Sequence, residues 1–293
     1  MRKFQYLFLF VCTIFFTCNP VYANTLDEEI DTFMNQPTPG YNEINEMNNG
    51  NVINEFDVIT KLENESIKNR SFSLDKEEYE NGVLKFKEEI SLLSKMSKNE
   101  LSKMNFNERQ INAIKSTEGL RAVDIKNDVA RAAAANFSFS ISKNRFERNN
   151  YAVFNAFWAW QSAPIWNGRD TLVFAWNDGF MVDRNRTTMK VTYRDIDGNY
   201  KGESRYASTG LIQGCRFDFE QSFAPGGLRA LSSGKAYVVV DNTSHKNAVE
   251  IVGEYFHNYN GINISVNIGR DLGISISPSD KSRSMGSDYI RMN

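Results

Sequence analysis

The sequence YAVFNAFWAWQSAPIWNGRDTLVFAWNDGF, residues 151–180, contains all four tryptophans of the chain. Large apolar side chains recur at every second position in its first and last thirds, which predicts two β-strands. The alternation places three of them on one face of each strand: Phe154, Trp158 and Trp160, then Leu172, Phe174 and Trp176. Two facing sheets would bury these rings, and each large aromatic side chain contributes a few kcal/mol when it is buried. The stretch therefore predicts the core of a β-sandwich.

The segment between the two predicted strands, residues 161–168, is typical of a loop because it contains Pro164 and Gly168. Trp166 lies in this loop, where no strand parity requires its ring to be buried. An exposed ring beside Arg169 and Asp170 is typical of a sugar platform or a membrane-surface anchor. A ring folded back over the end of the sandwich is the structural alternative. We predict Trp166, Arg169 and Asp170 as ligand-binding residues.

The same alternation appears on both sides of this stretch, from Asn136 to the C-terminus. Alternating or apolar runs occur at residues 137–142, 189–193, 211–219, 236–240, 249–255, 262–268 and 272–276. Turn signals such as Asp197-Gly198 and Asn260-Gly261 separate these runs. About nine short strands without an intervening helical period predict an all-β antiparallel sandwich over residues 136–293.

Residues 71–135 follow a helical period instead. Apolar residues recur at spacings of three and four from Tyr79 to Leu93, which lines one face of a helix. Capping boxes, which start helices by satisfying their unpaired N–H groups, are predicted at Asp75-x-x-Glu78, Ser97-x-x-Glu100 and Asn107-x-x-Gln110. We therefore expect a small helical region in front of the sandwich, and an α+β chain overall.

Residues 24–70 differ from both parts because they are acidic, rich in asparagine and poor in apolar residues. Pro37-Thr38-Pro39-Gly40 interrupts any regular period in their middle. Such a composition buries too little apolar surface to offset the entropy of ordering, so we predict a disordered or loosely ordered segment. It is either a functional pro-segment or spacer, or an exported leader without a function.

The first residues have the parts of a secretory signal peptide. Arg2 and Lys3 precede an apolar run over residues 4–16, and Val21-Tyr22-Ala23 fits a cleavage site. We predict a signal peptide over residues 1–23, cleaved after Ala23, and a secreted, extracellular protein. A lipid on Cys18 is disfavoured because Thr17 is not the small residue that such sites use before the cysteine.

No segment after the signal peptide is long and apolar enough to predict a transmembrane helix. Cleavage removes Cys12 and Cys18 and leaves Cys215 as the one cysteine of the mature chain. We therefore expect packing, and not disulfides, to hold the mature fold together.

The helical region contains LLSKMSKNELSKMNFNERQINAIKSTEGLRA at residues 92–122. This pattern, in front of a β-rich domain, resembles a short helical module of exported proteins from low-GC Gram-positive bacteria. The resemblance implies a secreted protein of a Gram-positive bacterium, and it identifies no catalytic residue. The stretch lacks the Gly-x-Gly hairpin with which a helix-hairpin-helix module binds a DNA phosphate.

Charge and residue types disfavour nucleic acids, metals and other cofactors. The net charge is −2 and the basic residues do not cluster, so the counterion release that drives nucleic-acid binding has no basis. His245 and His257 have no cysteine or carboxylate at metal-ligand spacing. The segment Asp195–Asn199 predicts a hairpin turn and not a calcium loop, because the later bidentate glutamate is missing. Cys215 has the inward parity of its strand and is expected in the core.

Three functions remain. The few catalytic groups and the loop tryptophan favour a secreted, non-enzymatic protein that binds a surface ligand, namely a glycan, a cell envelope or a membrane surface. The first alternative is an exported toxin or bacteriocin-like protein with a removable acidic pro-region. The second is a hydrolase, whose carboxylate pair would come from Asp170, Asp178, Asp183, Asp218 and Glu220.

Overall fold

The computed structural model describes residues 20–60, 76–104, 106–165, 169–194, 200–211, 213–220, 231–258, 266–268, 274–276 and 282–293. The chain divides into two units, residues 1–37 and 38–293. Helix α2 (Pro20–Asn35) lies in the first unit and includes Ala23, the predicted cleavage position. Residues 1–19, with Cys18, lie outside the described residues. Within the described ranges, no helix is both long and apolar enough to cross a membrane.

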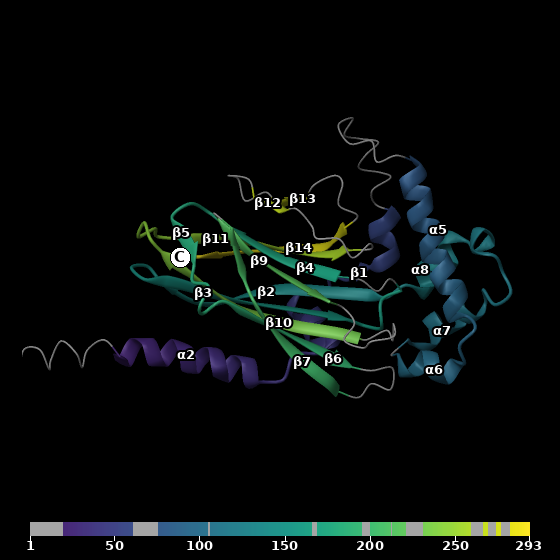
Figure 1. The fold of residues 1–293 in the computed structure, drawn as a ribbon, viewed down its shortest axis with the longest axis horizontal. Helices are drawn as coiled ribbons and strands as arrows, with labels where there is room; N and C mark the ends of the chain where they lie inside the picture. Colours follow the sequence, from purple (N-terminus) through teal and green to yellow (C-terminus); the bar gives the residue numbers. More distant parts are fainter. Residues whose placement is uncertain are drawn as a thin grey trace, which may run out of the picture. The chain divides into compact units, whose positions relative to one another are not determined.

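Helices make up most of the second unit before residue 136. They are α3 (Tyr41–Met47), a helix at residues 55–60, α5 (Lys76–Leu93), α6 (Lys98–Lys103), α7 (Glu108–Lys115), the 3-10 helix η1 (Ala122–Asp124) and α8 (Asn127–Ala133). Two predicted capping boxes are confirmed, at Ser97 for α6 and at Asn107 for α7, and the one predicted at Asp75 lies outside the described residues. Helices α5 to α8 gather at one end of the strands (Figure 1).

Two antiparallel sheets form the strand-rich part. The larger has the order β1-β2-β3-β10-β6-β7, with β5 also paired to β10. Its strands are β1 (Ile53–Asn54), β2 (Asn136–Glu147), β3 (Tyr151–Trp160), β5 (Phe180–Val182), β6 (Thr188–Arg194), β7 (Tyr200–Ala207) and β10 (Leu231–Asn242). The smaller has the order β14 (Ser282–Met292), β11 (Val249–Asn258), β4 (Arg169–Trp176), β9 (Gly214–Glu220) and β8 (Thr209–Leu211). Strands β12 (Val266–Ile268) and β13 (Ile274–Ile276) form a separate pair.

The predicted combination of helices with mostly antiparallel β-structure is confirmed. From Asn136 onward, the described residues contain nine strands of seven residues or more and four strands of three residues. Two of the short strands, β12 and β13, lie within the predicted runs at 262–268 and 272–276, whereas β5 was too short for alternation to reveal it. The predicted turn Asp195–Asn199 lies outside the described residues, and the strands on its two sides, β6 and β7, are antiparallel partners.

Aromatic side chains from both sheets meet in one core. The ring centroids of Phe154 on β3 and Phe174 on β4 lie 5.2 Å apart, with the rings edge to face. The sequence-based prediction of burial is confirmed for all three strand tryptophans, which are at most 1% exposed: Trp158, Trp160 and Trp176. The stretch at residues 151–180 therefore supplies many of the aromatic side chains of this core.

Trp158 depends on a glycine of the neighbouring strand. Gly234 on β10 pairs with Trp158, and a Cβ at Gly234 would come within 1.9 Å of the indole Cζ2. The missing side chain leaves the space in which the indole lies, 5.5 Å between centroids from Phe219 of β9. Close packing of a ring this large thus requires glycine at position 234.

Residues 38–60 are more ordered than the composition of residues 24–70 predicts. Helix α3 contacts β2 and β3 and buries Ile44, while Phe56 and Ile59 are buried in the core of the helical region. These few apolar side chains find partners far along the chain, which the composition of a local window does not reveal. Residues 61–70 of the predicted loose segment lie outside the described residues.

Candidate functional site

Asp170 and His257 are paired residues of the neighbouring strands β4 and β11. Asp170 Oδ1 lies 2.7 Å from His257 Nδ1, and the Tyr255 hydroxyl donates a hydrogen bond to Asp170 Oδ2. Tyr255 and His257 are two positions apart on β11, so their side chains share one face of the sheet. All three side chains lack exposed surface. A polar network therefore lies inside an otherwise aromatic core.

Glu55 joins this network from the N-terminal side of the chain. It is the first residue of the helix at 55–60, which Asn54 caps by accepting a hydrogen bond from Phe56 N at 3.1 Å. Glu55 Oε2 accepts a hydrogen bond from the backbone N–H of Ile165 at 2.9 Å. Its other oxygen lies 3.7 Å from His257 Nε2, an ion-pair distance longer than a hydrogen bond. We call Glu55, Asp170, Tyr255 and His257 the buried cluster.

Aromatic rings enclose the cluster. Trp160 meets the His257 ring edge to face at 5.3 Å between centroids. Phe137 contacts both Trp160, at 4.9 Å, and Tyr255, at 4.4 Å. These rings keep water away, and electrostatic interactions are stronger in such a medium than in solvent.

The surroundings of His257 determine its charge. Burial alone would lower its pKa, but the carboxylates of Asp170 and Glu55 raise the pKa to about 9 from the usual 6.5. His257 is therefore a cation at neutral pH, held between two carboxylates. Burial and the Asp170 carboxylate raise the pKa of Tyr255 well above 10, so its phenol stays protonated and donates.

The cluster resembles the base and orienting carboxylate of a hydrolytic site, but it is closed to substrates. An Asp–His pair acts on a substrate only when the second imidazole nitrogen reaches the reacting group. Here neither Asp170 nor His257 has exposed surface. The thiol of Cys215 is also buried, and burial raises its pKa. Among the described residues, no group of three His, Cys, Asp or Glu side chains is placed to hold a metal ion.

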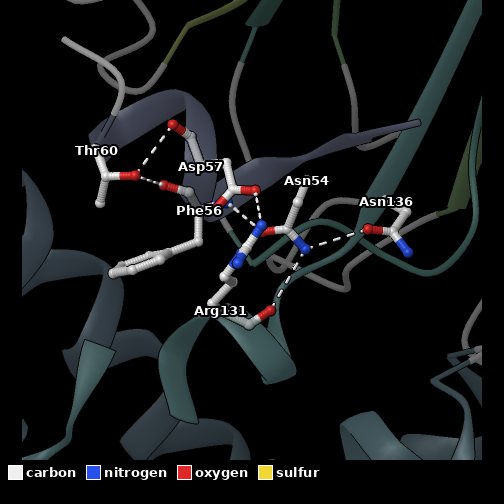
Figure 2. Close-up of polar contacts among 6 residues, drawn as sticks. All are labelled: Asn54, Phe56, Asp57, Thr60, Arg131 and Asn136. Atoms are coloured by element: carbon white, nitrogen blue, oxygen red, sulfur yellow. Dashed lines mark hydrogen bonds and ion pairs between the residues drawn. The ribbon is translucent and has the colours of Figure 1, made fainter. Parts of the chain in front are cut away.

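A second set of polar contacts holds residues 54–57 from the outside (Figure 2). The Asn54 side-chain amide donates to Asn136 Oδ1 at 3.1 Å and to the Arg131 carbonyl at 3.3 Å. The Arg131 guanidinium donates to Asp57 Oδ2 at 2.6 Å. The segment that carries Glu55 is thus fixed to both α8 and β2.

The residues predicted to bind a ligand are in three different situations. Trp166 lies outside the described residues. Arg169 is the first residue of β4, with 37% of its side chain exposed and Nε 3.4 Å from Glu220 Oε1. Asp170, expected beside Trp166 at the ligand, is instead fully buried in the cluster. The sequence did contain a signal for this burial, because Asp170 alternates in step with Leu172 and the other inward residues of β4.

The other carboxylates considered for hydrolysis are engaged by neighbours of their own. The pairs are Asp178 with Gln213, Asp183 with Arg186, Asp218 with Arg216 and Glu220 with Arg169. Asp170 lies with His257 and Glu55 in the buried cluster, and none of these four carboxylates belongs to that cluster.

Sequence reasoning missed His257 and Glu55 as members of a site. His257 has the parity of Tyr255 and Ile251, so its inward direction was visible in the sequence. Glu55 gave no such signal, because its side chain meets Ile165, 110 positions away, and His257.

No family model and no curated protein matches the sequence. Similar solved structures include the collagen-binding domain of a Staphylococcus aureus adhesin, with TM-score 0.30, 7% identity, and coverage of 52% of this chain and 95% of that domain. ACE19, the collagen-binding subdomain of the Enterococcus faecalis surface protein ACE, has TM-score 0.27, 7% identity, and coverage of 52% and 92%. Scores and identities this low support no conclusion about the fold or the function of the chain.

Proposed function

We propose that the protein is an exported, non-enzymatic binding protein that recognises a surface ligand through Trp166 and Arg169. The observation that supports this proposal is the anchoring of the chain on both sides of residues 166–168. Ile165 donates its backbone N–H to Glu55, and Asp170 is bonded to His257 and Tyr255. Both anchors belong to the buried cluster. A short segment with fixed ends loses less entropy when it binds a ligand, which is why binding residues concentrate on loops of rigid scaffolds.

The chemistry beside this segment favours a glycan of the cell envelope over a membrane surface. Sugars offer an apolar face to an aromatic ring and hydroxyl groups to charged side chains, so Trp166 with Arg169 and Glu220 matches both. Anionic lipids instead select clusters of unpaired cations, whereas Arg169 is paired with Glu220. Residues 166–169 therefore form the binding site of the proposal.

Replacing Trp166 tests the proposal. We expect Trp166→Ala to weaken binding to isolated cell walls and to immobilised glycans by about tenfold or more, as for an aromatic hot spot. Tyr289→Ala is the matched control, because Tyr289 is a 51% exposed aromatic residue on β14. Unchanged binding of Trp166→Ala to walls, glycans and liposomes would rule out this site.

Two further measurements separate the proposal from its alternatives. Turnover of polysaccharide or ester substrates by the unmodified protein would favour the hydrolase and contradict a purely binding role. The N-terminal sequence of the protein recovered from culture medium tests export, and a start at Asn24 is the expected result.

A further inference from the structure

The backbone of Ile53 and Asn54 adds a two-residue strand, β1, to the edge of β2, and the helix at residues 55–60 follows it directly. Ile53 and Asn54 pair with Phe137 and Asn136, and Glu55 N donates to the carbonyl of Ala135 at 2.9 Å. Such pairing requires an extended backbone and no particular sequence. The edge of β2 therefore offers a place for two extended residues of a peptide that continues as a helix, and side-chain pockets must supply the specificity.

The first pocket receives an aliphatic side chain. Gly286 on β14 has φ +137°, and a Cβ at this position would come within 2.4 Å of Ile53 Cδ1. The absence of a side chain at Gly286 leaves room for Ile53, which packs against the main core.

The second pocket is built for a carboxylate. It presents the backbone N–H of Ile165 and the cationic ring of His257 to Glu55, which has no exposed surface. A neutral side chain here would leave buried donors and a buried positive charge without compensation. Among the contacts of residues 53–57, this one therefore discriminates most strongly.

Two further contacts complete the pattern. Phe56 is 2% exposed and lies 5.3 Å from Phe86 of α5 between ring centroids. Asp57 pairs with Arg131 at the surface, where 64% of the arginine side chain is exposed. The pair with Arg131 adds charge preference and little affinity.

The groups described above that receive residues 53–57 lie between Phe86 and Gly286, beyond residues 61–75. We define the arm as residues 38–60 and the body as residues 76–293. We propose that the body contains a binding site for an acidic peptide whose first two residues pair with β2 and whose following residues form a helical turn, and that Ile53–Asp57 of the arm is its resident ligand. The site selects five successive side chains in the order aliphatic, polar, acidic, aromatic and acidic, with the central carboxylate next to His257. It is separate from the glycan site proposed at Trp166.

This site changes what a cut between arm and body would do. If residues 24–69 were a removable pro-region, cleavage within 61–75 would sever the chain but leave every contact of Ile53–Asp57 in place. The covalent link raises the effective concentration of the arm at its site and makes none of these contacts. The arm therefore stays bound after cleavage.

A peptide binding experiment on the full chain tests the site. Glu55→Lys and Phe56→Ser are introduced together to displace the arm, and a fluorescent peptide with the natural residues 51–60 is added. We expect saturable binding to this variant and none to the unmodified chain, whose site is occupied. Failure of the peptide to bind a variant that retains its sheet circular dichroism would overturn the proposal.

Matched peptides test the carboxylate pocket. Glu55→Gln in the peptide should weaken binding by about tenfold or more, because it removes the negative charge that lies next to the His257 cation. Asp57→Asn in the peptide should weaken it less than about fivefold, because the pair with Arg131 is exposed. Equal affinities of the natural peptide and the Glu55→Gln peptide would contradict a site for acidic peptides.

A second measurement covers a displaced-arm variant that does not fold. A site-specific protease sequence replaces part of residues 61–75 in the otherwise unmodified chain, and the cleaved protein is passed through a gel-filtration column. Co-elution of arm and body supports the site, and release of the arm from a folded body overturns it. The same cleaved protein with Glu55→Gln should release its arm at a lower denaturant concentration.

Discussion

Asp170 and His257 face each other across two neighbouring strands, with 2.7 Å between Oδ1 and Nδ1 and no exposed surface on either side chain. Removing one partner of such a pair is costly because the other charge stays buried without compensation. The stability of the protein should therefore respond to pH and to substitutions at this pair more than to changes elsewhere.

The stability of the protein should fall as the pH rises from 6.5 through 9. The pKa of His257 is raised from 6.5 to about 9 in the folded state, so its stabilising contribution is complete below pH 6.5 and is lost as the folded protein loses this proton. The free energy of unfolding should decrease by up to about 3 kcal/mol over this range. Urea denaturation across these pH values measures the decrease.

Two histidine substitutions serve as the control for this pH dependence. His257→Asn should remove most of the slope, whereas His245→Asn should keep it, because His245 is exposed on a turn with φ +50° that asparagine tolerates. A slope that is the same in both variants would assign the pH dependence to other groups.

Glu55→Ala should lower the free energy of unfolding by about 3 kcal/mol or more, because it removes the acceptor of the buried Ile165 N–H and one carboxylate beside His257. Asp57→Ala, two residues away, removes a carboxylate whose partner Arg131 is largely exposed. Its cost should be about 1 kcal/mol or less. Thermal or urea unfolding of the two variants compares them directly, and equal costs would contradict the role given to Glu55.

Gly234→Ala should destabilise the core by about 2 kcal/mol or more, since the new Cβ would meet the Trp158 ring at 1.9 Å. Near-ultraviolet circular dichroism should report a changed environment of the tryptophans. Ser233→Ala is the neighbouring control, because Ser233 is partly exposed and points to the other face of β10. An unaltered melting temperature for Gly234→Ala would show that the indole has room to move.

The thiol of Cys215 should react with a soluble thiol reagent only as fast as the protein unfolds, because the side chain is buried and burial raises its pKa. A chain expressed from Asn24 contains this single cysteine, which simplifies the measurement. Ser287→Cys places a second thiol at an exposed position of β14 and should react at once. Rapid modification of Cys215 in the native protein would contradict the burial of β9.

Strand parity predicted the aromatic core because it is a local property. Trp158, Trp160 and Trp176 each have the direction that the alternation of their own strand assigns. The capping boxes at Ser97 and Asn107 were visible for the same reason, since a cap and its partner are three residues apart.

The buried cluster was beyond such local reasoning. Asp170 and His257 have inward parity, but their contact depends on β4 lying beside β11, which no spacing in the sequence reveals. Glu55 lies in a segment whose composition predicts loose structure, and its burial depends on Ile165 and His257. Composition describes what a segment can bury by itself, whereas this segment is ordered by the rest of the chain.

Glu55 precedes Ile165 and His257 in the chain, which sets the order in which the buried cluster can be completed. The ribosome releases Glu55 before Ile165, 110 positions later, and releases His257 later still. At a synthesis rate of about 5 to 20 residues per second, many seconds pass between the synthesis of Glu55 and that of the groups that hold its carboxylate. Glu55 is thus made long before its last contact can form, and a molecule interrupted before β11 has this carboxylate without His257.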